Sequence, residues 1–266
     1  MQISEITLSD LEEIKELQPD NWSDILIPIR FYIESVFCKP IKIKSSNKII
    51  GIGASLLHKS SAWLAHIIVH PEERSKGIGG LIIQTLLEEL KRQKISSVSL
   101  IATIAGEPLY EKYNFKKETD YLFFKNENYS LQKLENNLIR DSAVQYYKDI
   151  LLLDKKISGE DRTLLLTPHL ANAKVFVENN TISGFYMPTL GEGLLLAEDN
   201  DIGIELLKLR LEKQPIIVLP IENNVAIKFL LENRFCQFQK GTRMILGDRI
   251  DFKSKMIYSR IGGNFG

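Results

Sequence analysis

The sequence predicts an α/β fold with a mixed α+β sheet, built as two tandem domains. The chain has 266 residues, more than the usual roughly 100 to 150 residues of a single domain. In its first half, apolar residues switch repeatedly between the period of strands and the period of helices. Short patterns of this half recur in the second half, which indicates a degenerate duplication. We therefore expect one domain at residues 1–126 and another at residues 127–266, with a linker near residues 126–134.

The composition is that of a globular protein without a dominant charge. Lys plus Arg and Asp plus Glu number 34 each, and 44% of the residues are hydrophobic. This balance gives no sign of a nucleic-acid or anionic-membrane partner. No stretch approaches the roughly 18 apolar residues of a membrane helix, and the N-terminus lacks a signal-peptide pattern, so we expect a cytoplasmic protein. Cys38 and Cys236 are poor candidates for a disulfide or zinc site, so we expect both in the core and no metal.

The predicted order of elements in the first half is β-α-α-β-β-β-α-β-α-β. Residues 3–6 read as the first strand, and a helix begins near Ser9. A second helical stretch at residues 22–37 ends before Pro40. Polar turns then separate the three strands of a meander, at residues 41–44, 49–57 and 62–69. The remaining elements are a helix at 78–93, a strand at 97–103, a helix at 107–113 and a strand at 118–124.

A glycine-rich segment, Arg-Ser-Lys-Gly-Ile-Gly-Gly at residues 74–80, opens the amphipathic helix. A helix N-terminus presents backbone N–H groups that lack intrahelical acceptors, together with a positive dipole end, and so binds phosphate. Gly77, Gly79 and Gly80 are expected to let a ligand approach, while Arg74 and Lys76 add positive charge. The segment has neither the Gly-Lys-Ser/Thr of a Walker P-loop nor a dinucleotide-binding fingerprint. The sequence therefore predicts a cradle for a pyrophosphate.

The chain at this point resembles the GNAT N-acetyltransferase superfamily. Residues 69–79 read Val-His-Pro-Glu-Glu-Arg-Ser-Lys-Gly-Ile-Gly, and residues 109–115 read Leu-Tyr-Glu-Lys-Tyr-Asn-Phe. Both match motifs of that superfamily, and the order of elements agrees. The resemblance implies direct transfer of an acetyl group from acetyl-CoA to an amine, with proximity supplying much of the rate. It also implies that two parallel strands splay apart at residues 67–69 and 99–101 to receive the pantetheine arm.

The resemblance assigns roles to individual residues. Tyr110 matches the tyrosine that protonates the leaving thiolate. Thr103 and Gly106 replace the Asn and Ala of many members, and Asn114 replaces a glycine. The residues implied in cofactor binding are Ile67, Ile68, Val69, Arg74, Ser75, Lys76, Gly77, Ile78, Gly79, Gly80, Thr103 and Tyr110.

The general base is open between a side chain, His66, and a water relay. His66 has a suitable intrinsic pKa and lies on the strand beside the expected thioester. Strand alternation puts it on the face opposite to Val69 unless a β-bulge intervenes. The alternative for His66 itself is a structural role, and the base is then a water relay.

The second half repeats two patterns but loses the site. Residues 180–184 match residues 47–51, and Leu230 to Phe235 match Tyr110 to Phe115. The helix that corresponds to the cradle begins with Glu198, Asp199 and Asp201, whose carboxylates would repel a pyrophosphate. Leu230 cannot donate a proton, so one site per chain is expected.

The C-terminal half also resembles the domain that follows the catalytic one in a tandem bacterial and archaeal GNAT subgroup. The matching residues are Asp154, Gly159, Asp161 and Arg162, then Asn223, Ala226 and Phe235, then residues 242–247. Arg162 and Arg243 are candidates to contact an acidic ligand. The alternative is that they form buried ion pairs with Asp161 and Asp248.

These observations favour an acetyl-CoA-dependent N-acetyltransferase that acts on a small-molecule amine, with the second domain closing the acceptor cleft. The alternative is a non-catalytic module that binds acetyl-CoA as a sensed ligand. Protein substrates are disfavoured because no charged tract suggests a groove for a tail. The chain is expected to be a monomer or a homodimer.

Overall fold

The structure is a computed structural model that describes residues 1–20, 22–129 and 137–265. The second part of the predicted linker, residues 130–134, lies outside the described residues. No helix within the described ranges is long and apolar enough to cross a membrane.

The first half contains the predicted elements in the predicted order, and their bounds differ from the predicted ones mainly at the ends. The strands are β1 (Gln2–Glu5), β2 (Cys38–Ser45), β3 (Lys48–His58), β4 (Ser61–Val69), β5 (Ser97–Ala102) and β6 (Lys116–Lys125). The helices are α1 (Leu11–Ile14), α2 (Leu26–Glu34), α3 (Ile78–Arg92) and α4 (Glu107–Lys112).

The second half adds seven strands and four helices among the described residues. The strands are β7 (Ile139–Asp141), β8 (Lys174–Glu178), β9 (Thr181–Met187), β10 (Leu194–Ala197), β11 (Ile216–Pro220), β12 (Cys236–Gly247) and β13 (Ile257–Ser259). The helices are α5 (Tyr147–Ser158), α6 (Thr163–Leu166), α7 (Asn200–Leu211) and α8 (Asn224–Glu232).

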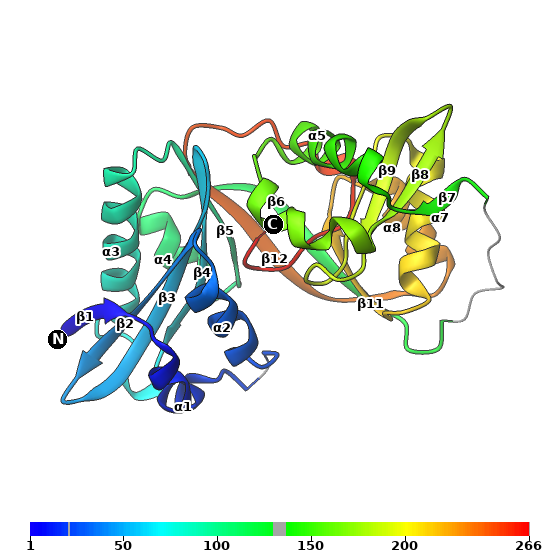
Figure 1. The fold of residues 1–266 in the computed structure, drawn as a ribbon. Coiled ribbons are helices and arrows are strands. Elements are labelled where there is room, and N and C mark those ends of the chain that lie inside the picture. The colour runs from blue at the N-terminus through cyan, green and yellow to red at the C-terminus, as the bar shows by residue number, and fades with distance from the viewer. Residues whose placement is uncertain (21, 130–136, 266) are drawn as a thin grey trace.

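Strands from both halves share the larger sheet, whose order is β1-β2-β3-β4-β5-β12-β6-β11. The long strand β12 lies between β5 and β6 and pairs antiparallel with each of them (Figure 1). The smaller sheet, in the order β13-β10-β9-β8-β7, belongs to the second half. The sequence did not predict this shared sheet, because a strand pattern does not say which edge the strand will join.

Helices cover the two faces of the larger sheet (Figure 1). On one face, α3 buries Ile78, Ile82 and Leu86 against β-strand residues such as Leu64 and Leu100. On the other face, α1 and α2 pack on Trp63 and Ile68 in a core that also contains Phe185 and Phe265 of the second half. The two halves are therefore joined both by strand pairing and by a common apolar core.

The duplicated patterns have the same geometry. The turn before β3 holds Ser46 and Asn47 at φ +49° and +65°, and the turn before β9 holds Asn179 and Asn180 at +50° and +61°. Two successive positive φ values are typical of tight hairpin turns in which Asn is favoured. The two equivalent glycines, Gly51 and Gly184, both lie close under a helix. A Cβ at Gly51 would lie 3.0 Å from Ile78 and Ile82 of α3, and a Cβ at Gly184 would lie 2.9 Å from Ile202 and Leu206 of α7.

The two cysteines differ in their surroundings. Cys38 is buried, as expected, but Cys236 is exposed. The expectation for Cys236 was wrong because this residue begins β12, where the strand pairs with Lys125 at the exposed end of β6.

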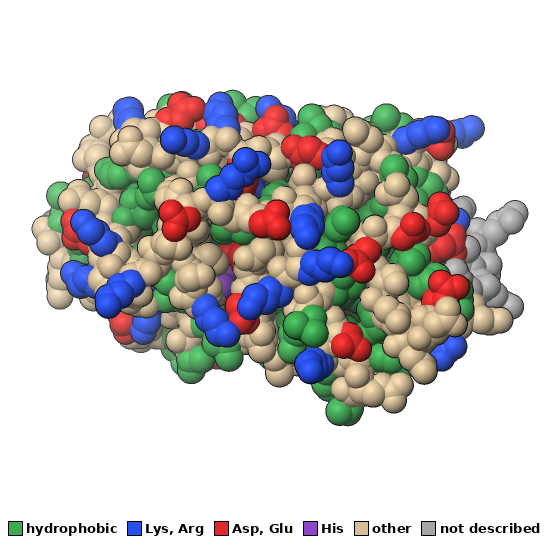
Figure 2. All heavy atoms as spheres, turned by 90° about the horizontal axis from the view of Figure 1, so that it is seen from above, with side chains coloured by type: hydrophobic (Ala, Val, Ile, Leu, Met, Phe, Trp, Pro, Cys, Tyr) green, Lys and Arg blue, Asp and Glu red, His purple; other side chains and the backbone are tan. Residues whose placement is uncertain are grey.

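Charged side chains of both signs are interspersed over the face in Figure 2.

Candidate functional site

Strands β4 and β5 are parallel neighbours that separate part of the way along. They pair at Ser61 with Ser97, Ala62 with Val98, and Trp63 with Ser99. Beyond these pairs β4 continues to Val69 on its own, while β5 keeps its pairing with β12 as far as Ala102. His70 donates to the Ile50 carbonyl, so by alternation the N–H groups of Ile67 and Val69 point toward the gap. The predicted splay is present in the structure.

A β-bulge lies on β4 at the edge of this gap. Ile68 pairs with Ile52 and Ala65 pairs with Ala54, so β4 has one more residue than β3 in this interval. His66 absorbs the extra residue with φ +48°. Its side chain lies on the α2 face, where the imidazole contacts the Trp22 ring with the centroids 5.8 Å apart. The bulge thus exists, and His66 still faces away from the α3 side on which Val69 packs.

His66 is held by two residues that the sequence did not point to. The Tyr32 hydroxyl lies 2.8 Å from His66 Nδ1, and the Asn264 amide donates to the same hydroxyl at 2.6 Å. Because Tyr32 accepts from Asn264, its own proton is directed to Nδ1, and the imidazole carries its proton on Nε2. Burial lowers the pKa of His66 to about 4, so the ring is neutral at pH 7. Residues 32, 66 and 264 are far apart in sequence, which explains why no sequence pattern revealed the cluster.

The glycine-rich segment forms a left-handed turn at the start of α3. Gly77 is the N-cap residue with φ +83°, and Ser75 has φ +63°. The first intrahelical hydrogen bond runs from the Leu81 N–H to the Gly77 carbonyl. Among the described residues, no acceptor takes the backbone N–H groups of residues 75–80. A row of free N–H groups at a helix N-terminus is suited to a phosphate group.

The three glycines of this turn have different neighbours. A Cβ at Gly77 would meet no atom within 4 Å, so this position is open to a ligand. A Cβ at Gly79 would lie 3.1 Å from Leu109, and one at Gly80 would lie 2.6 Å from the Tyr113 hydroxyl. Both contacts come from α4 and its end. Gly79 and Gly80 therefore allow α3 to pack closely on α4, which corrects our expectation that all three glycines clear the path of a ligand.

The cations of the segment are both exposed. Arg74 donates through Nε to the Val69 carbonyl at 3.3 Å, which holds its side chain over the end of β4. Lys76 forms an ion pair with Glu73 at 3.2 Å. A surface pair of this kind contributes little energy and opens readily. Both side chains lie on the same turn as the free N–H groups.

Tyr110 lies on α4, the helix that follows β5. Burial raises the pKa of its hydroxyl to about 12, so the group is protonated at neutral pH. The ring packs edge-on against Phe115 at 5.9 Å, and the hydroxyl has no side-chain hydrogen bond among the described residues. Asn114 has φ +65°, which confirms that Asn replaces glycine at the left-handed helix end.

Thr103 is engaged at the other end of α4. Its hydroxyl accepts the Gly106 N–H at 3.2 Å, and its carbonyl accepts the Gly106 and Glu107 N–H groups. This residue thus caps the turn into α4, and its acceptor groups are occupied by that turn.

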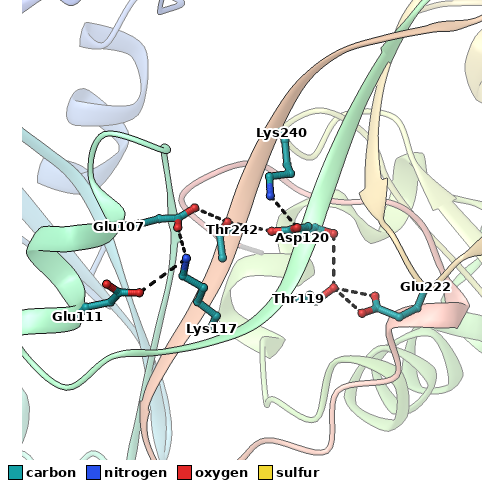
Figure 3. Close-up of polar contacts among 8 residues, drawn as sticks. All are labelled: Glu107, Glu111, Lys117, Thr119, Asp120, Glu222, Lys240 and Thr242. Atoms are coloured by element: carbon teal, nitrogen blue, oxygen red, sulfur yellow. Dashed lines mark hydrogen bonds and ion pairs between the residues drawn. The ribbon is translucent and has the colours of Figure 1, made fainter.

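A polar network ties α4 to the second half of the chain (Figure 3). The hydroxyl of Thr242 of β12 donates to Glu107 at 2.5 Å and lies 2.9 Å from the carboxylate of Asp120 of β6. Lys117 pairs with Glu107, and Lys240 donates to Asp120 at 2.9 Å. The helix that carries Tyr110 is therefore positioned by contacts from β6 and β12.

The second half keeps the scaffold without the cradle. The Asp199 carboxylate accepts the N–H groups of Asp201 and Ile202 at 2.8 and 3.3 Å, so a side chain fills the N-terminus of α7. Phe235 donates to the Leu230 carbonyl at 2.9 Å, as Phe115 donates to the Tyr110 carbonyl at 3.2 Å. Leu230 itself is fully buried.

Two arginines singled out in the sequence are buried and paired, but with other partners than expected. Arg162 binds Asp154 rather than Asp161, and Arg243 binds Glu118 at 2.6 Å rather than Asp248. Asp161 instead pairs with Lys59 at 2.6 Å. The expected partners were the carboxylates adjacent or nearby in sequence, whereas α5 and β6 bring others closer in space. Within the described residues, no group of three or more His, Cys, Asp and Glu could hold a metal ion.

A cleft of about 430 Å³ opens beside β6 on the face opposite to α4. The residues that line it are Glu118, Thr119, Glu222, Arg249, Ile250, Asp251, Phe252 and Ser254. Thr119 donates to Glu222 at 2.7 Å, as Figure 3 shows. The cleft lies within the usual range of about 300 to 1,000 Å³ for small-molecule sites.

Known proteins resemble this arrangement. The acetyltransferase (GNAT) domain family matches residues 33–128. An uncharacterized N-acetyltransferase of Pyropia yezoensis is 26% identical over 88 residues, which are 32% of this chain and 51% of that protein. The chain thus spans about half the length of this curated relative.

Solved structures resemble the chain over nearly its whole length. A putative acetyltransferase from Pyrococcus horikoshii has a TM-score of 0.83 and 20% identity, with 100% of this chain and 95% of that chain covered. A tandem GNAT protein from the clavulanic acid biosynthesis pathway has a TM-score of 0.60 and 9% identity, with 92% and 98% covered. The residues matched by the acetyltransferase (GNAT) domain family contain the splayed strands and the glycine-rich turn, and the whole chain shares the tandem-domain fold of these solved structures.

Proposed function

We propose that the protein is an acetyl-CoA-dependent N-acetyltransferase with one active site, in its N-terminal half, and a small-molecule amine as acceptor. The observation that carries the proposal is that β4 separates from β5 and leads, a few residues later, into the turn with the free N–H groups of residues 75–80. An extended cofactor with a pyrophosphate at one end needs both features. The second half has the corresponding helix, but Asp199 fills its N-terminus.

Acetyl-CoA would be held at two regions, the glycine-rich turn and the unpaired part of β4. The free N–H groups of residues 75–80, with Arg74 and Lys76, would take the pyrophosphate. The backbone of Ile67 to Val69 would pair with the pantetheine arm along the gap. When bound, the cofactor supplies a thioester that an amine can attack directly.

Tyr110 is assigned as the general acid. Its pKa of about 12 keeps the proton on the hydroxyl at neutral pH, where a thiolate leaving group needs one. The network of Glu107, Lys117 and Thr242 keeps the helix of Tyr110 in place.

Water is favoured over His66 as the group that removes the amine proton. The Nδ1 atom of His66 faces the Tyr32 hydroxyl, and the lowered pKa of about 4 makes the imidazole a weak base. Its Nε2–H is a donor that can instead orient the acceptor or an ordered water.

The experiment measures two properties of the full chain: acetyl-CoA binding by calorimetry and thiol release with a panel of amines. Wild type is expected to bind acetyl-CoA and to release thiol with at least one amine. Tyr110→Phe should lower kcat by about 100-fold, a typical contribution of general acid catalysis, while acetyl-CoA affinity stays the same. Tyr147→Phe removes a tyrosine hydroxyl in the second half and serves as the matched control.

Two results would contradict the proposal. Folded protein without affinity for acetyl-CoA would remove its basis. Binding without thiol release for any amine would instead support the alternative, a non-catalytic module that senses acetyl-CoA.

A further inference from the structure

Three buried arginines surround Tyr121 on the face of the larger sheet opposite to α3. Arg162, Arg243 and Arg260 are each at most 4% exposed, and Tyr121 is fully buried. The Arg260 guanidinium lies 5.9 Å from the centre of the Tyr121 ring. Burial raises the pKa of Tyr121, and the charges of Arg243, Arg260 and Arg162 oppose that rise. We call these four residues the arginine cluster.

The carboxylate partners of the cluster leave two guanidinium edges free. Glu192 accepts from Arg260 Nε and Nη2, and Glu118 accepts from Arg243 Nε. Arg243 Nη2, Arg260 Nη1 and the Tyr121 hydroxyl are buried without a well-formed hydrogen bond among the described residues, although Arg243 lies close enough to the Tyr121 hydroxyl to interact with it. Buried polar groups are nearly always paired, so donors left free at one place indicate a missing acceptor.

The cluster adjoins the point at which β4 and β5 separate. Arg243 pairs with Ile101 of β5, and its guanidinium lies 4.9 Å from the Trp63 ring on β4. Trp63 and Ser99 form the last pair before the gap, and the Ser99 hydroxyl is also buried without a partner in the described part of the chain. Arg243 and the Ser99 hydroxyl therefore lie next to the end of the gap in which the proposed function puts the pantetheine arm.

The cluster also adjoins the 430 Å³ cleft. Two of the residues that line the cleft contact Arg243 directly, since Glu118 accepts its Nε at 2.6 Å and the Phe252 ring lies 3.9 Å from its guanidinium. The charged residues that line the cleft are Glu118, Glu222, Asp251 and Arg249, so acidic groups predominate, and the Arg243 guanidinium lies behind Glu118 and Phe252. A ligand with an ammonium and a carboxylate group has a partner of opposite charge for each group.

We propose that the arginine cluster binds the carboxylate of the acceptor, so that the acceptor is an amino acid or a similar amine with a nearby carboxylate. Arginine is suited to this role because its planar fork matches a carboxylate in two hydrogen bonds. The Tyr121 hydroxyl donates a further hydrogen bond. This inference rests on the proposed function for the placement of the amine, but the carboxylate site itself rests on the free donors.

The test compares amino acids with their carboxamides. Each pair shares its side chain and its amine, and only the acid carries the negative charge. The amine of the carboxamide is the less basic one and is more often unprotonated, so a preference for the acid cannot arise from amine reactivity. Binding is measured by thermal shift in the presence of CoA, and turnover by thiol release from acetyl-CoA.

Wild type is expected to prefer one or more acids over the matching carboxamides in both assays. Arg243→Lys keeps the charge beside Glu118 but loses the fork, and should raise KM for the preferred acid about tenfold without changing KM for acetyl-CoA. Tyr121→Phe removes the hydroxyl alone and should act in the same direction. Arg92→Lys is the matched control, because Arg92 also pairs with one glutamate at 2.6 Å but on the exposed face of α3.

Specific outcomes would overturn the inference. Equal or better turnover of the carboxamides would do so, and so would equal losses for acid and carboxamide in Arg243→Lys. If no amine is acetylated, the proposed function fails by itself. The thermal-shift comparison of wild type with Arg243→Lys and Tyr121→Phe then still decides whether the cluster binds a carboxylate.

Discussion

The hydroxyl of Thr242 donates a hydrogen bond to the Glu107 carboxylate 2.5 Å away, and so joins the second half of the chain to the helix that carries Tyr110. The same hydroxyl lies 2.9 Å from Asp120 (Figure 3). Hydrogen bonding to Lys117 and Thr242 holds the pKa of Glu107 below its ordinary value, so the carboxylate is charged at neutral pH. A strand of the second half thus helps to place a residue of the first.

Thr242→Val is expected to lower the free energy of unfolding by about 1 to 2 kcal/mol, because a buried donor to a charged group is lost while the shape is kept. It should also lower kcat, since α4 loses its contact to β12. Urea unfolding and thiol-release kinetics measure the two effects. Thr181→Val, at an exposed strand end, is the control, and a Thr242→Val enzyme with unchanged stability would refute the argument.

The acid side of the stability profile is expected to depend on His58. Burial lowers its pKa to about 4 from an ordinary 6.5, with Arg162 acting in the same direction and Glu160 against it. Between pH 6.5 and pH 4, His58 is therefore protonated in the unfolded chain but not in the folded chain. Stability from this group is complete above pH 6.5 and is lost as the pH falls toward 4.

The expected size of this loss is about 3 kcal/mol between pH 7 and pH 4. His58→Gln should remove that part of the slope, whatever its effect on stability at pH 7. Unfolding free energies of wild type, His58→Gln and the surface control His70→Gln are measured by urea titration at several pH values. Parallel profiles for wild type and His58→Gln would contradict the prediction.

Local patterns were sufficient to predict the scaffold. The apolar periodicity of residues 41–69 gave three strands of a meander, and the turn at Asn47 recurs with the same geometry at Asn180. The spacing from Tyr110 to Phe115 is repeated from Leu230 to Phe235 with the same hydrogen bond. Each of these features depends on neighbours within a few residues, which a sequence displays directly.

Long-range contacts were not predictable in the same way. The insertion of β12 between β5 and β6 depends on which sheet edge is free, and the pairing of Arg243 with Glu118 follows from that insertion. The positive φ of His66 depends on the β3 register, and no residue type near it signals a bulge. The cleft beside β6 is lined by residues of three segments that are distant in sequence, so its chemistry became visible only in the folded chain.

Asn264, in the C-terminal segment, is expected to influence kcat/KM for the acceptor, because it holds Tyr32, which in turn contacts His66. Its amide donates to the Tyr32 hydroxyl at 2.6 Å, and Phe265 packs on Phe31 with ring centroids 5.7 Å apart. Asn264→Leu should leave Tyr32 free to change its partner, which alters the orientation of the His66 ring. We expect kcat/KM for the acceptor to fall several-fold with acetyl-CoA affinity unchanged. Asn233→Leu is the control, and equal losses for acceptor and acetyl-CoA would show a general effect on folding instead.

Two substitutions at Gly77 are expected to distinguish the role of its backbone conformation from its role in leaving space for a ligand at the glycine-rich turn. Its φ of +83° is unfavourable for a residue with a Cβ, yet a Cβ there would meet no atom within 4 Å. Gly77→Ala should lower both the stability, by about 1 to 2 kcal/mol, and the affinity for acetyl-CoA. Asn tolerates the left-handed region, so Gly77→Asn should keep most of the stability but still place a side chain over the free N–H groups. An affinity about tenfold below wild type in Gly77→Asn, measured by calorimetry, is the expected result. Wild-type affinity in that variant would mean that the phosphate groups do not approach the turn at Gly77.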